Sequence, residues 1–272
     1  MYKRQIGDKY PEVSIKLYSG IYYLESRGYR PEEIFRIGKT LKNKAKRYYT
    51  VDNSIYENRK SAGNVIDKEA GILNRGNLTR LKNFLNRAAQ GERLTVGFIG
   101  GSITQGFAAT APDKCYAART VAWLRKVFPN TEFDYVNAGI GATNSQFGAA
   151  RVQEDLLCRL PDLVMVEFSV NDHCTPHDME TYEGLIRQIY GSRSCPAMVL
   201  LHSVYYDTGK SAAYYHAQIG RHYDLPCISM QNSIYPAVAA GRLPAEKITA
   251  DFLHPNDPVS YTHLRAHETA AN

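Results

Sequence analysis

The sequence predicts a doubly wound, three-layer α/β/α fold with a five-stranded parallel sheet, preceded by a mainly helical N-terminal extension. From about Thr95 onward, short apolar segments alternate with longer amphipathic stretches, and such βα repeats imply a parallel sheet with right-handed crossovers. The apolar segments are almost continuously hydrophobic, which is typical of strands that are covered on both faces.

The strands and helices of this fold are expected in alternation along the chain. The predicted strands are Leu94–Ile99, Phe133–Val136, Leu163–Phe168, Met198–His202 and Cys227–Met230. The predicted helices are Tyr116–Val127, Gln146–Leu160, Met179–Tyr190, Ala212–Tyr223 and Ile234–Ala240. Ligands of such sheets bind outside the carboxyl ends of the strands, so the residues that follow each strand are the candidates for a functional site.

The N-terminal part of the chain differs in composition from the rest. We expect an extension of unknown role at residues 6–76 and the α/β domain at 77–258, with helices around Glu32–Tyr49 and Leu78–Ala89. Residues 1–60 carry 14 Lys/Arg against 7 Asp/Glu. A basic surface can meet nucleic acid or anionic lipid. A solvated helix face is the simpler interpretation, and a nucleic-acid partner is disfavoured.

Both ends of the chain can be reverse-translated into a transposon-end sequencing adapter. MYKRQ at residues 1–5 matches the adapter, and VSYTHLRAHET within residues 259–272 matches its reverse complement and extension. We therefore expect both segments to be adapter-derived and the native N-terminus to be missing. No signal peptide or transmembrane segment is visible. The subcellular location of the protein stays open, with the cytoplasm slightly favoured.

The five cysteines show no paired C-x-x-C spacing and are expected to be reduced and mostly buried. The segment His173-Cys174-x-x-His177 superficially resembles a set of metal ligands. No second cysteine pair stands at zinc-finger spacing, so no metal site is expected.

The first chemical motif is GFIGGSITQG at residues 97–106, where Ser102 follows the first predicted strand. A glycine-rich turn there can cradle a phosphate or present a nucleophile. The glycines fall at 97, 100, 101 and 106, which does not match the dinucleotide fingerprint, and no phosphate-loop motif is present. Nucleotide binding is therefore disfavoured.

Three further motifs follow later strands. NAGIGATNS at 137–145 is rich in small residues, which let a turn expose its backbone N–H groups. VEFSVNDH places Asn171 after the third strand, and DFLHP places Asp251 three positions before His254. A carboxylate so placed can accept one imidazole N–H and leave the other nitrogen free as a base. Each motif alone also has an ordinary interpretation, as a turn or a surface pair.

Together and in this order, the four motifs resemble the SGNH (GDSL-type) hydrolase family, whose fold is flavodoxin-like, over about Asn77 to Asp257. The resemblance implies a serine nucleophile at Ser102 and a catalytic pair at Asp251 and His254. It implies no metal ion and no organic cofactor.

The resemblance also implies an oxyanion hole. Its donors are the Ser102 N–H, the Asn171 side-chain amide and one backbone N–H of the second motif. A gapless match places that donor at Ala142, where family members often carry glycine, with Gly141 directly before it. The sequence leaves the choice between the two open.

These features predict a serine ester hydrolase that cleaves small acyl esters, with O-acetyl groups on carbohydrates as the expected substrates. The acetyl preference is implied by the resemblance alone, because a fold and a triad do not fix a substrate. The alternatives are a lipase, lysophospholipase or thioesterase, an O-acyltransferase, and a non-catalytic glycan-binding protein. The oligomeric state stays open.

Several other residues receive structural interpretations. His202 and His216 are expected to be structural or at the surface, and Asp172 to be a hydrogen-bonding neighbour that positions Asn171. Glu167 lies on a predicted buried strand and would need a partner. The tyrosines are expected to serve in packing more than in sugar stacking.

Overall fold

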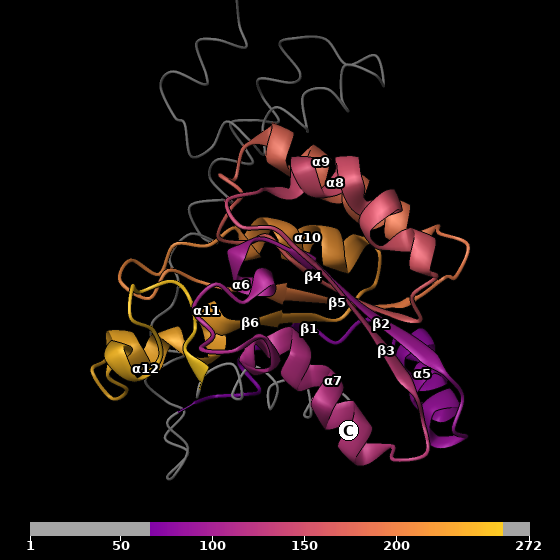
Figure 1. Ribbon diagram of the computed structural model, residues 1–272. Helices are drawn as coiled ribbons and strands as arrows, with labels where there is room; N and C mark the ends of the chain where they lie inside the picture. Colours follow the sequence, from indigo (N-terminus) through magenta and orange to yellow (C-terminus); the bar gives the residue numbers. More distant parts are fainter. Residues whose placement is uncertain (1–65, 258–272) are drawn as a thin grey trace, which may run out of the picture. The chain divides into compact units, whose positions relative to one another are not determined.

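The computed structural model describes residues 66–257 (Figure 1). The predicted adapter-derived ends, most of the predicted extension and the expected helix Glu32–Tyr49 lie outside the described residues. Residues 66–257 form a sheet in the order β1-β6-β5-β4-β2-β3. Its strands are β1 (Ile72–Asn74), β2 (Leu94–Gly100), β3 (Phe133–Gly139), β4 (Leu163–Glu167), β5 (Ala197–His202) and β6 (Cys227–Ser229).

The five predicted strands are all present and mutually parallel, which confirms the α/β fold class. The prediction of a wholly parallel, five-stranded sheet is wrong at one edge, where β1 pairs antiparallel with β6. β1 has three residues, each half-buried, and so short a strand shows no hydrophobic period. β3 runs to Gly139, beyond its predicted end at Val136, because it pairs with β2 along its whole length.

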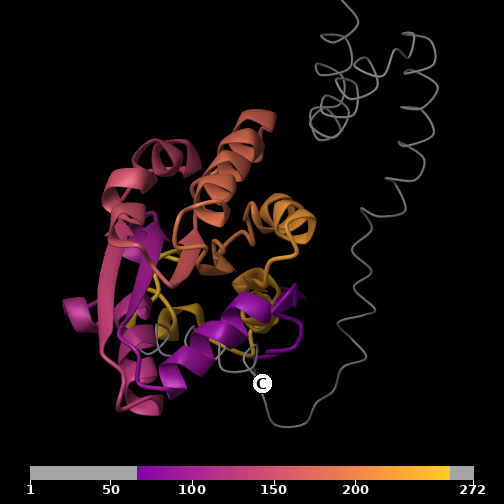
Figure 2. The same ribbon diagram turned by 90° about the vertical axis from the view of Figure 1, so that its right-hand side faces the viewer.

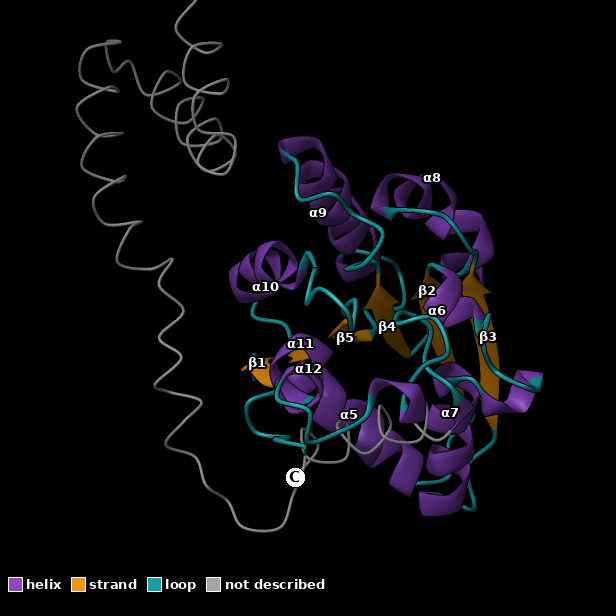
Figure 3. Ribbon diagram, turned by 90° about the vertical axis from the view of Figure 1, so that its left-hand side faces the viewer, coloured by secondary structure: helices purple, strands orange, loops and turns teal. Residues whose placement is uncertain are grey.

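The helices cover both faces of the sheet, as a doubly wound fold requires (Figures 1 and 3). The longer ones are α5 (Thr79–Ala89), α7 (Tyr116–Val127), α8 (Ser145–Asp155), α9 (Pro176–Tyr190) and α10 (Ala213–His222). The shorter ones are α6 (Ser102–Gln105), α11 (Met230–Ser233) and α12 (Tyr235–Ala239), with 3₁₀ turns at Pro112–Lys114, Leu157–Arg159 and Ala245–Lys247.

Two helix boundaries differ from the prediction for local reasons. α8 stops at Asp155 because the backbone leaves the helical conformation at Leu156 (φ −132°). A separate 3₁₀ turn, Leu157–Arg159, then fills most of the predicted remainder of the helix. α9 starts at Pro176 rather than Met179. Thr175 and Asp178 form a capping box there, which satisfies backbone N–H groups at the helix start.

The core consists of two apolar layers, one on each face of the sheet. Alternate residues of β4 point to opposite faces: Leu163 and Met165 join the layer beneath α5 and α7, and Val164 and Val166 join the layer beneath α8, α9 and α10. The view turned by 90° shows the same separation of the helices (Figure 2). Each such fully buried side chain contributes roughly 1.5–3 kcal/mol to folding.

The sheet register brings the ends of three strands together. Gly100 at the end of β2 lies opposite Gly139 of β3 and Glu167 of β4. The segments that leave β2, β3 and β4 therefore start from one edge of the sheet, and these are the segments that carry the first three motifs. Within residues 66–257, no helix is long and apolar enough to cross a membrane.

Candidate active site

Ser102 is the first residue of α6 and follows Gly100, the last residue of β2, and Gly101. A Cβ at Gly101 would collide with the side-chain amide of Asn171, and a Cβ at Gly100 would collide with Thr104. The turn into α6 thus passes too close to its neighbours for any larger residue. It holds the half-buried Ser102 directly above the end of the sheet.

His254 approaches Ser102 from the far end of the described chain. Its Nε2 lies 2.7 Å from the Ser102 Oγ, and its Nδ1 lies 2.6 Å from Asp251 Oδ2. An ionised carboxylate can only accept, so the Nδ1 carries the proton and the Nε2 accepts from the serine hydroxyl. The three side chains form one hydrogen-bonded chain that leads from Asp251 to Ser102.

Asp251 is held in its ionised form. Burial alone would raise the pKa of this carboxyl, but hydrogen bonds outweigh it and hold the pKa well below its usual range. The donors are the His254 imidazole, the backbone N–H groups of His254 (2.8 Å) and Leu253 (3.1 Å), and the Thr249 hydroxyl (2.9 Å). The carboxylate can therefore orient the imidazole and stabilise its charged form.

The loop after β3 passes beside Ser102 and carries the two candidate backbone N–H donors, those of Gly141 and Ala142. A Cβ added to Gly141 would lie 3.6 Å from the Ser102 Cβ. The Gly141 N–H donates to Gln105 Oε1 at 2.9 Å and is thereby occupied. Ala142 has a left-handed backbone (φ 58°), and its N–H meets no acceptor in the described part of the chain. Sequence reasoning missed Gln105, since nothing in its local sequence marks it.

Asn171 follows β4 and packs its side chain against Gly101. Its Oδ1 is buried there without a hydrogen-bond partner among residues 66–257. Its backbone N–H donates to the Phe168 carbonyl at 3.0 Å, which fixes the turn. The side-chain amide nitrogen has no described partner, so it is available to a ligand.

Asp172 makes no hydrogen bond to the Asn171 side chain, so the expectation of a hydrogen bond that positions Asn171 is wrong. Its buried carboxylate accepts the Ser145 N–H at the start of α8 and lies 2.9 Å from His216 Nε2. The His216 ring stacks on Tyr182 of α9 at 3.5 Å. Asp172 therefore ties the segments after β3 and β4 to α10.

The other singled-out residues are mostly structural. His202 and His216 are fully buried, as a structural role requires, and burial lowers the pKa of His202. Glu167 is also fully buried, and burial raises its pKa to about 7. Its partner is Ser169, whose hydroxyl lies 3.3 Å from Oε1. Among the tyrosines, Tyr206 is buried but Tyr214 is exposed, so packing does not account for all of them.

The cysteines are free, but only Cys115 and Cys227 are buried, so the expectation that most are buried is wrong. Cys158 and Cys195 are exposed because they lie in surface turns. Within residues 66–257, no group of three or more His, Cys, Asp or Glu side chains could hold a metal ion.

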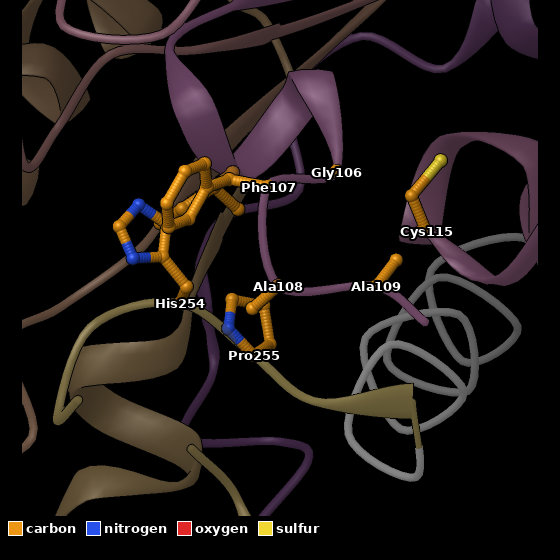
Figure 4. A pocket seen from close by; sticks show the side chains of 8 residues that line it. Gly106, Phe107, Ala108, Ala109, Cys115, His254 and Pro255 are labelled. Carbon is orange, nitrogen blue, oxygen red and sulfur yellow. The ribbon is translucent and has the colours of Figure 1, made fainter. Parts of the chain in front are cut away.

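A second feature that sequence reasoning missed is Phe107, just after α6. Its side chain is 70% exposed, and its ring centroid lies 4.8 Å from that of His254. The two rings border a small hollow (Figure 4). The hollow is lined by Ile103, Gly106, Phe107, Ala108, Ala109, Cys115, His254 and Pro255.

The chain matches one protein-family profile and several solved structures. The profile of the GDSL-like lipase/acylhydrolase family matches residues 98–258. Among solved structures, the chain is similar to a two-domain esterase active on acetylated mannans, crystallised with mannopentaose. The two share 50% sequence identity with a TM-score of 0.74 over 75% of this chain, which spans only 56% of the esterase chain.

Two more distant structures share the fold. An acetyl xylan esterase variant from Geobacillus stearothermophilus is 20% identical, with a TM-score of 0.55 over 66% of this chain and 94% of that one. An α/β hydrolase from the metagenome of Lake Arreo, Spain, is 18% identical, with a TM-score of 0.55 over 65% of this chain and 94% of that one. No curated protein matches the chain in sequence.

Proposed function

Because the chain belongs to the GDSL-like lipase/acylhydrolase family, we propose that it is a serine ester hydrolase that removes small acyl groups through an acyl-enzyme at Ser102. We propose O-acetyl groups on carbohydrates as its substrates. The observation that supports the ester-hydrolase chemistry most directly is the hydrogen-bonded chain from Asp251 through His254 to Ser102. That arrangement supplies a nucleophile, a base and a group that orients the base.

The reaction proceeds in two halves. His254 Nε2 takes the Ser102 proton as Oγ attacks the acyl carbon, and the same imidazole then gives that proton to the leaving alcohol. A water molecule enters, loses a proton to His254 and attacks the acyl-enzyme, and the proton returns to Ser102 as the acid departs. The Asp251 carboxylate stabilises the imidazolium in both halves without being protonated itself.

Three donors stabilise the tetrahedral oxyanion in this mechanism: the Ser102 N–H, the Asn171 amide and the Ala142 N–H. We place the second-motif donor at Ala142 because the Gly141 N–H already donates to Gln105. The left-handed backbone of Ala142 explains why glycine suits this position, since an L-residue there costs roughly 1–2 kcal/mol. A backbone donor survives the change from glycine to alanine.

The carbohydrate substrate rests on the similarity to the esterase that is active on acetylated mannans. Half of the aligned residues are identical, but this chain spans 56% of that protein. An O-acyltransferase would use the same acyl-enzyme and differ only in the acceptor. Acceptor and acyl chain are therefore the two variables that the experiment must separate.

A fluorophosphonate probe tests the chemistry first. We expect the wild-type protein to be labelled at Ser102 and the Ser102→Ala variant to remain unlabelled. Hydrolysis of nitrophenyl esters should then fall as the acyl chain grows beyond acetyl, and acetylated manno-oligosaccharides should release acetate. If the wild-type protein is not labelled but still binds these oligosaccharides, the chain is a glycan-binding protein and not an enzyme. Acetyl transfer to an added sugar in preference to water would indicate an acyltransferase.

A further inference from the structure

Phe107 is a large apolar side chain that the fold leaves in water. It is 70% exposed, the most exposed of the large hydrophobic residues in the described part of the chain. Single exposed apolar side chains are common on protein surfaces, so the position of this ring, and not its exposure alone, singles it out. Its ring lies beside that of His254, at 4.8 Å between centroids and 48° between planes (Figure 4).

The backbone around Phe107 is fixed. Its N–H donates to the Ser102 carbonyl at 3.0 Å. Gly106 before it takes a left-handed conformation (φ 91°), and a Cβ there would lie 2.6 Å from that of Cys115. The turn that presents Phe107 thus depends on a glycine and on a hydrogen bond to the nucleophile residue itself, so the backbone that carries the ring is held in place.

We propose that Phe107 is the stacking platform for the sugar ring whose hydroxyl carries the acyl group. The proposal rests on the function proposed above. The leaving alcohol receives its proton from His254, so it must lie within reach of that imidazole. Phe107 supplies the exposed aromatic surface beside it.

The chemistry of a pyranose fits this surface. A sugar ring has polar hydroxyls at its edge and apolar C–H groups on its faces, so it can stack on a phenyl ring and keep its hydroxyls in water. Stacking removes these C–H groups and the phenyl face from water, which is favourable. Since phenylalanine offers no hydrogen bond, the platform recognises the ring face and not the pattern of hydroxyls.

An alkyl chain could also rest on an apolar surface, but it does not need a flat one. Leucine keeps the apolar character of Phe107 and removes the planar face, whereas tyrosine keeps the face. The pair Phe107→Leu and Phe107→Tyr therefore separates a sugar from a lipid. Val127 is 45% exposed at the end of α7 and does not line the hollow beside His254, so Val127→Ala serves as the control.

The experiment compares an acetylated manno-oligosaccharide with vinyl acetate, whose leaving group is too small to stack. For the oligosaccharide we expect kcat/KM of Phe107→Leu to fall about 10-fold, mainly through KM, as the loss of about 1.4 kcal/mol implies. Phe107→Tyr should stay within about 3-fold of wild type, and Val127→Ala should match wild type. Vinyl acetate hydrolysis should be the same in all four proteins.

Equal losses on both esters would assign Phe107 to positioning His254 and overturn the proposal. Unchanged oligosaccharide hydrolysis in Phe107→Leu would also overturn it, as would a fall seen only with long-chain esters. Calorimetry in the Ser102→Ala background measures oligosaccharide binding without turnover. Binding that weakens about 10-fold on adding Phe107→Leu supports the platform even if the wild type hydrolyses neither ester, in which case the proposed function alone fails. Unchanged binding would contradict the proposal that Phe107 is a stacking platform.

Discussion

His254 Nε2 lies 2.7 Å from the Ser102 Oγ, although 152 positions separate the two residues along the chain. Ser102 is placed by the end of β2, whereas the His254 segment is held by a backbone bridge between Thr249 and Pro255. Just beyond it, Asp257 accepts hydrogen bonds from the Thr110 N–H and hydroxyl. The pairing therefore depends on contacts that connect the last described segment with the loop after α6.

Ser102→Ala and His254→Ala should abolish turnover to a similar extent. Removing the serine leaves no nucleophile, and removing the imidazole leaves a serine without a base, so the two act as one unit. The measurement is kcat and KM on 4-nitrophenyl acetate, with the exposed His222→Ala as the control. Near-wild-type turnover in Ser102→Ala would contradict the mechanism.

Asn171→Ala should be milder and act on kcat. In the proposed mechanism it removes one of three oxyanion donors, which should lower kcat on the order of 10²–10³-fold with KM little changed. The same assay measures it. An effect confined to KM would show that Asn171 binds the substrate in its ground state and is not an oxyanion donor.

Gln105→Met tests the support of the oxyanion loop. The change keeps the length of the side chain but removes the acceptor for the Gly141 N–H, a hydrogen bond worth about 1 kcal/mol. We expect kcat to fall about 5-fold, since the freed peptide no longer fixes the Ala142 N–H. Gln105→Glu retains the acceptor but adds a negative charge near the oxyanion, so it should lower kcat with a different dependence on salt. Equal kcat in wild type and Gln105→Met would mean that the loop holds its shape without Gln105.

Gly101→Ala should damage the site through Asn171. The added Cβ would collide with the Asn171 side-chain amide, and such overpacking typically costs about 1–3 kcal/mol of stability. In the Asn171→Ala background the collision is relieved, so the second substitution should cost much less. A double-mutant cycle in urea unfolding and in kcat measures this coupling. Additive effects would show that the glycine is required for another reason.

Glu167 makes folding stability depend on pH. Burial raises its pKa from 4.5 to about 7, so the folded state binds this proton more tightly than the unfolded state. The stabilisation is complete below pH 4.5 and is lost as the pH rises through about 7, by on the order of 3 kcal/mol. Glu167→Gln cannot titrate and should flatten this part of the curve.

Urea unfolding at pH 5 and at pH 8 measures the Glu167 effect. The free energy of unfolding should fall between these two pH values by clearly more in wild type than in Glu167→Gln. Glu154→Gln removes an exposed carboxyl and is the control, which should behave as wild type. Identical slopes in wild type and Glu167→Gln would exclude Glu167 as the source of the pH dependence.

The sheet and its helices were largely predictable because their signals are local. A strand covered on both faces must be apolar along its length, as β4 is, and an amphipathic helix such as α7 repeats its apolar residues with its own period. β1 was missed since three half-buried residues carry no period. The end of β3 was missed because its pairing with β2 prolongs it through residues of weak strand propensity.

The sequence by itself determined which residues were candidates for the chemistry: a serine after a glycine turn, an asparagine after a strand and an Asp-x-x-His pair. Only the tertiary structure decided what these residues meet. In the folded protein the Gly141 N–H donates to Gln105, Asp172 lies within hydrogen-bond distance of His216, and the Phe107 ring lies beside that of His254. The physical reason is that local sequence sets the chemistry of a residue, whereas its neighbours in space are set by strand register and by the loops that leave the sheet edge.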